Sequence, residues 1–163
     1  MSSSSSDIRG RADGDVEAIS QARETLFGAF NATDLDNFMA AIADDVVFMT
    51  HGGPPSIVGK RAVRSSYKEF FERGPFIPNV TFSSDEVVLS GDWAFNRGTW
   101  VIIRTYKRSV RRERLESSYV MIWRRQPEGM WKLARLIWNG APVPIKAQKT
   151  GRSLRKRKAK LRK

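Results

Sequence analysis

The sequence contains no cysteine and only one histidine among its 163 residues. Disulfide bonds, thiolate metal sites and cysteine nucleophiles are therefore excluded, and so is a metal site built from several histidines. No apolar run approaches the roughly 18 residues of a membrane-spanning helix, and the serine-rich start lacks the apolar segment of a secretory signal. We therefore expect a cytoplasmic protein with no transmembrane segment, no metal and no other cofactor.

Acidic residues are missing from one end of the chain, although the net charge of the whole chain is +12. Residues 146–163 hold ten of the 29 Lys and Arg residues, whereas residues 1–145 hold 19 basic and 17 acidic residues. Low hydropathy and charge of one sign predict a disordered tail over 142–163. Such a tail suits contact with nucleic-acid phosphates, a localisation signal, attachment to an anionic membrane surface, or simple solubilisation. The candidate polyanion-binding residues are Arg155, Lys156, Arg157, Lys158, Lys160, Arg162 and Lys163.

Hydrophobic periodicity divides the chain into a helical first half and a strand-rich second half. Apolar residues three and four apart predict helices over 15–31, 34–44 and 60–73. Thr33 is the expected N-cap of the second helix, with Asp36 three residues later. β-Rich segments bounded by turn residues predict strands over 46–49, 80–89, 93–106, 115–125 and 131–138.

Helices followed by a strand meander indicate the α+β class, in which three N-terminal helices pack on a strongly curved antiparallel sheet. Alternation places Met121 and Trp123 on one face of a strand, and Val120 and Ile122 on the other. One face would pack on the helices, and a second copy of the chain is the simplest cover for the other. We therefore expect a flexible leader over 1–14, one domain over 15–141, and a homodimer.

Four segments resemble the ketosteroid-isomerase-like, SnoaL-like superfamily, whose cone-shaped fold is shared with a nuclear transport factor. They are FNATDLDNFMAAIADDVVFM, PPSIVGKRAVRSSYKEFF, SGDWAFNRGTW and VMIWRRQPEGMWKLARLIWN, and the similarity extends over roughly 16–139. The resemblance is to an uncharacterised bacterial subgroup, and it implies a pocket at the open end of the cone and usually a dimer. The superfamily includes isomerases, cyclases, dehydratases, hydrolases and binding modules, so the resemblance implies no single reaction.

The isomerases of this superfamily use a carboxylate base and two oxyanion donors, a tyrosine and a protonated aspartic acid. By the resemblance, Thr50 stands at the position of the base, Leu26 at that of the tyrosine and Met121 at that of the aspartic acid. All three groups are missing, so we expect no ketosteroid isomerisation. Any reaction would be metal-free general acid–base chemistry of the isomerase, cyclase or dehydratase type.

His51 and Tyr119 are the remaining candidates for catalysis. His51 follows a buried strand near the lost base position, where it would be a general base, a hydrogen-bond donor or an ordinary loop histidine. Tyr119 has the strand parity of Met121, so its hydroxyl would donate to a substrate oxygen, or else its ring would pack at the sheet surface. Arg97 is a further candidate for contact with an anion.

The expected pocket lining is apolar and rich in aromatic side chains. Trp138 would be a pocket wall by the resemblance, and plain core otherwise. Two functions remain open: binding or conversion of a small apolar, ring-containing ligand, or a non-catalytic dimeric module whose basic tail contacts nucleic acid or another polyanion. The candidate pocket residues are Leu26, Phe30, Phe48, Thr50, Tyr67, Phe71, Met121, Trp123 and Trp138.

Overall fold

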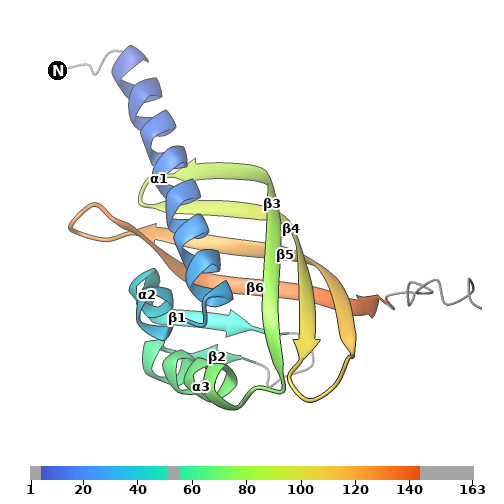
Figure 1. Cartoon of the computed structure of the whole chain (residues 1–163). Helices are drawn as coiled ribbons and strands as arrows, with labels where there is room; N and C mark the ends of the chain where they lie inside the picture. Colours follow the sequence, from blue (N-terminus) through green and yellow to red (C-terminus); the bar gives the residue numbers. More distant parts are fainter. Residues whose placement is uncertain (1–4, 51–55, 144–163) are drawn as a thin grey trace, which may run out of the picture.

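The computed structural model describes the backbone of residues 5–50 and 56–143 and the side chains of residues 10–50 and 56–140. Within these ranges the three helices and two shorter strands come first in the chain, and four long strands follow (Figure 1). The elements are α1 (Ser5–Asn31), α2 (Leu35–Ala40), β1 (Ile42–Met49), β2 (Ile57–Val58), α3 (Lys60–Arg73), β3 (Phe76–Ser90), β4 (Trp93–Tyr106), β5 (Arg112–Arg125) and β6 (Trp131–Val143).

One six-stranded sheet in the order β2-β1-β6-β5-β4-β3 forms the body of the fold. The strands β3 to β6 are 13 to 15 residues long and follow one another as antiparallel hairpins. They curve around the C-terminal half of α1, and α3 lies beside β1 and β2 (Figure 1). The expected α+β class with helices on a curved sheet is confirmed.

One strand pair departs from the expected antiparallel sheet. The strand β1 runs parallel to β6, with Val47 opposite Arg135 and Met49 opposite Ile137, so the sheet is mixed. A parallel pair needs a long connection, and here everything from β2 to β5 lies between the two strands. All other strand pairs are antiparallel, as expected, and this edge is the one parallel exception in the described sheet.

The start of α1 also differs from the expectation. The helix begins at Ser5 rather than near residue 15, so residues 5–14 are part of α1. The N-terminal turns project beyond the sheet (Figure 1), and Val16, expected on the buried face, is 38% exposed, whereas Ile19 is fully buried. Apolar spacing therefore located the part of the helix that packs on the sheet, which is shorter than the helix itself.

The second helix is shorter than expected, because α2 ends at Ala40 and Ile42 already belongs to β1. Its N-cap is Asp34, whose carboxylate accepts a hydrogen bond from the backbone N–H of Asn37 at 3.1 Å. The expected cap, Thr33, instead has a positive φ of 54°, which ends the preceding turn. After this helix, the neighbouring residues Asp44 and Asp45 lie within β1 and form ion pairs with Lys60 and Arg124.

The hydrophobic core fills the space between the helices and the inner face of the sheet. On β5, Tyr119, Met121 and Trp123 are buried, while the alternate residues Val120 and Ile122 face outward and are only partly covered. This alternation confirms the predicted faces of the strand. In the described part of the chain, no helix has the length and hydropathy needed to cross a membrane.

Candidate functional site

A cavity of about 330 Å³ lies between the helices and the inner face of the sheet. Every element of the described fold except β1 contributes to its wall, because the curved strands and the three helices converge there. The lining residues are Leu26, Phe27, Phe30, Phe38, Thr50, Ile57, Ser66, Tyr67, Phe70, Phe76, Pro78, Val80, Trp100, Ile102, Arg104, Met121, Leu136 and Trp138.

Aromatic rings from α1, α2 and α3 form the helical wall of the cavity. Phe30 stacks on Phe70 with ring centroids 5.9 Å apart, and Tyr67 stacks on Phe38 at 4.6 Å. The spacing of Tyr67 and Phe70 along α3 places both rings on the helix face that meets α1. The wall is therefore rigid and offers ring faces and edges to a bound molecule.

Polar groups are few in this lining. The lining side chains that carry them are Thr50, Ser66, Tyr67 and Arg104, together with the indole N–H groups of Trp100 and Trp138. Burial raises the pKa of the Tyr67 hydroxyl, so this group stays protonated at neutral pH and is available as a donor. None of the described lining residues carries a carboxylate, and Arg104 is the one charged side chain among them.

The structure brings six of the nine expected pocket residues to the cavity wall. They are Leu26, Phe30, Thr50, Tyr67, Met121 and Trp138.

The other three expected pocket residues do not line the cavity. Phe48 and Trp123 are fully buried away from the cavity, and Phe71 packs edge-on against Phe30 and Phe38. Strand parity placed Trp123 on the correct face, but the curvature of the sheet carries it past the cavity. Parity alone therefore does not distinguish lining residues from core residues.

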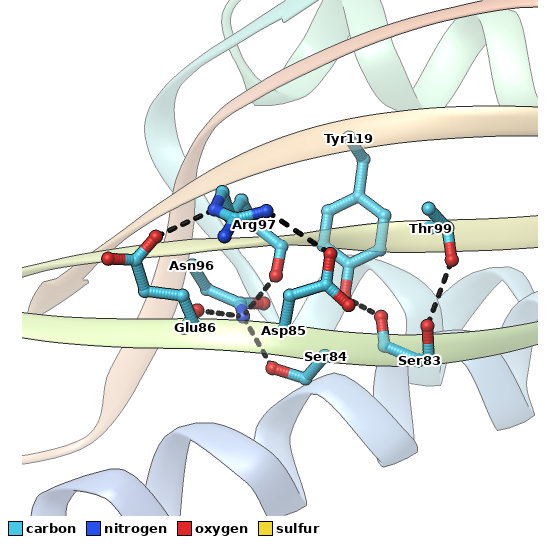
Figure 2. A network of polar contacts seen from close by, with 8 residues as sticks. All are labelled: Ser83, Ser84, Asp85, Glu86, Asn96, Arg97, Thr99 and Tyr119. Carbon is cyan, nitrogen blue, oxygen red and sulfur yellow. Dashed lines mark hydrogen bonds and ion pairs between the residues drawn. The ribbon is translucent and has the colours of Figure 1, made fainter.

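Tyr119 is buried on the inner face of the sheet, but it is not in the cavity wall. Its ring stacks on Trp100 with centroids 5.1 Å apart, and its hydroxyl donates to the Ser83 carbonyl at 3.0 Å (Figure 2). Burial raises the pKa of Tyr119, which keeps the hydroxyl a donor. Because the Tyr119 hydroxyl already donates its hydrogen bond to a backbone carbonyl, it is a poor candidate for donation to a substrate oxygen.

Arg97 is likewise occupied. Its guanidinium bridges Glu86 at 2.7 Å and Asp85 at 3.3 Å, across the irregularity where β3 shifts register (Figure 2). The neighbouring Asn96 is fully buried and donates to Ser84 Oγ and to the Glu86 carbonyl. These two side chains stabilise the β-bulge, so the expected anion contact at Arg97 has a structural explanation.

Two groups of expected site residues lie outside the described residues. They are His51 and the tail residues Arg155, Lys156, Arg157, Lys158, Lys160, Arg162 and Lys163.

Sequence reasoning missed several lining residues, among them Phe38, Phe70, Trp100 and Arg104. Phe38 and Phe70 lay on predicted buried helix faces, and Trp100 and Arg104 share the parity of Asn96 on β4. Periodicity therefore indicated which face of the helix or strand each residue lies on, but nothing in the sequence distinguished these residues from others on the same face. Among the described residues, no group of His, Cys, Asp or Glu side chains could hold a metal ion.

Comparison with known proteins agrees with this architecture. A sequence model of the SnoaL-like domain matches residues 24–134. No curated protein is significantly similar in sequence.

Several solved structures share the fold. A conserved protein from Planctomyces limnophilus is 26% identical, with a TM-score of 0.72, over 80% of this chain and 99% of that one. A ketosteroid isomerase-like protein from Erwinia carotovora is 28% identical, with a TM-score of 0.69, over 78% and 96%. An NTF2-like protein from Shewanella oneidensis has 17% identity and a TM-score of 0.61 over 76% and 98%, which shows the fold alone. Because the matched SnoaL-like region covers more than half of the sequence, the chain belongs to the SnoaL-like domain family.

Proposed function

We propose that the chain binds a small apolar, ring-containing molecule in the cavity between its helices and sheet. The observation that carries this proposal is the cavity itself, about 330 Å³ in volume and lined mainly by aromatic and aliphatic side chains. Pockets of this size and composition are typical of small-molecule sites. The ring faces of Phe30, Tyr67 and Trp100 favour a planar ligand over a flexible one.

The proposal does not include ketosteroid isomerisation. Leu26, Thr50 and Met121, the positions matched to the isomerase groups, all line the cavity, and none can take or hold a proton as a carboxylate does. The Tyr67 hydroxyl is a donor without a described carboxylate or imidazole to act as the base. We therefore confine the proposal to binding, with His51 as the residue to test for acid–base chemistry once a ligand is known.

A paired substitution tests the cavity. Ile102 lines the cavity and its neighbour Ile103 points to the opposite face of β4. Ile102→Trp fills the cavity, so it should weaken binding of 2-naphthol or a similar bicyclic probe at least about tenfold, whereas Ile103→Trp should not. Calorimetric titration gives the affinities, and thermal unfolding with saturating probe gives the stabilisation expected from ligand binding.

The proposal fails if the wild-type protein binds none of a panel of one-, two- and four-ring probes. It also fails if Ile102→Trp, shown by circular dichroism to be folded, binds the probe as tightly as the wild type does. Binding at an external surface would give that second result.

We also propose that the protein is a dimer through the outer face of the sheet. Cross-strand neighbours there form two apolar rows, Val88–Phe95–Ile122 and Val120–Ile137. Val88 is 48% and Ile137 is 39% exposed in the single chain. Apolar rows on a broad sheet face are typical of a surface that is covered in the assembled state.

The alternative function is supported by the charge distribution alone. Ten basic residues and no acid lie in 146–163, so we propose that this segment gives any polyanion binding that the protein has. Deleting it should abolish retention of a DNA duplex in a low-salt filter assay, and full-length binding should weaken steeply with salt. A deletion variant that still binds DNA tightly would contradict this assignment.

A further inference from the structure

We infer that the ligand of the cavity carries a carboxylate, which Arg104 binds while the apolar body of the ligand lies against the aromatic wall. This inference rests on the proposed small-molecule function and adds the chemical class of the ligand. The N–H donors of Arg104 have no acceptor among the described residues.

Arg104 lies on the inner face of β4 and lines the cavity. Its guanidinium lies over the Phe76 ring, 4.7 Å from the ring centroid, and its side chain is 30% exposed. Stacking on an aromatic ring holds the plane of a guanidinium and leaves its N–H edge free. The group is therefore oriented by the fold before any ligand arrives.

The donors of Arg104 have no hydrogen-bond acceptor in the described part of the chain. Its Nε is buried and lacks a partner among the described residues. A guanidinium has five N–H donors, and a buried donor without an acceptor costs free energy. An incoming carboxylate would satisfy two of these donors at once.

Glu113 is the nearest carboxylate, but it is engaged by other residues. Arg104 Nη1 lies 3.9 Å from Glu113 Oε2, too far for a hydrogen bond. The same Oε2 accepts from the Tyr106 hydroxyl at 2.7 Å, and Arg111 binds Oε1 directly. The hydrogen bond from Tyr106, and then that from Arg111, lowers the pKa of Glu113. Glu113 therefore helps to position Arg104 without consuming its donors.

The rest of the lining favours the same ligand class. No carboxylate lines the cavity within the described residues, and the other polar groups of the lining side chains are hydroxyls and the indole N–H groups of Trp100 and Trp138. The negative charge of Glu113, which lies outside the wall, is already engaged by Tyr106 and Arg111. A neutral apolar molecule would fill the cavity but leave the guanidinium edge unpaired. An aromatic carboxylate matches both the apolar wall and the single cation.

The test compares 2-naphthoate with 2-naphthamide, which has the same ring system and a planar polar group but no charge. Both are titrated calorimetrically into the full-length wild type, Arg104→Met and Arg61→Met. Arg61 is an exposed residue of α3 that is absent from the cavity wall, so its substitution controls for net charge. We expect Arg104→Met to weaken naphthoate binding about ten- to a hundredfold, the range for a charged hydrogen-bonded pair. Naphthamide binding should stay unchanged, and Arg61→Met should alter neither.

Arg104→Lys is a second variant that keeps the test possible if Arg104→Met does not fold. Lysine keeps the positive charge but lacks the planar, forked guanidinium. It should weaken naphthoate binding while leaving naphthamide binding intact. The inference is overturned, and the proposed function stands, if wild type binds both probes equally or if naphthoate affinity is unchanged in the Arg104 variants. Failure of the wild type to bind either of these probes would overturn this inference, and failure with the whole panel of one-, two- and four-ring probes would remove the proposed function as well.

Discussion

At the scale of single residues, Gly98 shows how closely β3, β4 and β5 approach one another. A Cβ at this position would lie 2.0 Å from the Ser83 carbonyl oxygen and 2.7 Å from the Tyr119 hydroxyl oxygen. These are the two atoms joined by the hydrogen bond that ties β5 to β3 across β4 (Figure 2). Glycine is therefore required here by space, at a position where its φ is not positive.

Gly98→Ala should destabilise the protein by about 2–4 kcal/mol, the sum of an overpacking cost and a lost buried hydrogen bond. Gly28→Ala is the matched control, because a Cβ there meets nothing within 4 Å on an exposed part of α1. That change should stabilise the protein by about 0.5–1 kcal/mol, since alanine is the better helix former. Urea unfolding gives both values, and equal effects of the same sign would contradict the crowding argument.

At the scale of elements, one acidic residue fastens α1 to the last hairpin of the sheet. Asp15 accepts a hydrogen bond from Arg125 on β5, and the Trp131 indole N–H on β6 lies 3.4 Å from its other oxygen. The side chains of Asp15 and Arg125 are only 15% and 18% exposed, so solvent screens this pair weakly. The hydrogen bond from Arg125, supported by that from Trp131, lowers the pKa of Asp15 against the effect of burial.

Because the pKa of Asp15 is lowered, the contribution of this contact to the stability of the fold depends on pH. The folded-state pKa of Asp15 lies below its unfolded-state value, so the contribution to stability is complete at neutral pH and is lost as the pH falls below about 4. Asp15→Asn should reduce the free energy of unfolding by about 1–3 kcal/mol at pH 7 and by much less in acid. Asp44→Asn, at a carboxylate whose side chain is 93% exposed, should have almost no effect at either pH. A loss in Asp15→Asn that stays constant with pH would contradict this account.

At the scale of the whole molecule, a single charge on the outer sheet face tests the proposed dimer. Ile137→Glu places a charge in the apolar row formed with Val120, whereas Val110→Glu places the same charge on a fully exposed turn residue. We expect wild type and Val110→Glu to sediment as dimers at tens of micromolar, and Ile137→Glu to sediment as a monomer. A wild-type protein that is monomeric at this concentration would contradict the proposed interface.

Local pattern was sufficient for much of this fold. The predicted bounds of α3 and β4 agree with the structure, and the inward parity of Met121 and Trp123 was predicted correctly. The periods of helices and strands depend only on residues close in sequence, so they can be recognised without knowing the tertiary fold. The similarity to the SnoaL-like family followed from the same segments and is confirmed by the family match.

Only the tertiary structure decided the features that depend on residues far apart in sequence. The parallel pairing of β1 with β6 joins segments separated by about half of the chain, and no local pattern encodes it. The sequence left open whether the Tyr119 hydroxyl meets a substrate or its ring packs at the sheet surface, and in the structure the hydroxyl is bound to Ser83, 36 positions away. Arg104 is left without a hydrogen bond because Tyr106 and Arg111 reach Glu113 first. The sequence determines which face a side chain points to, because that depends on backbone period. The register and curvature of the sheet determine which partner it meets, and these are set by packing of the whole domain.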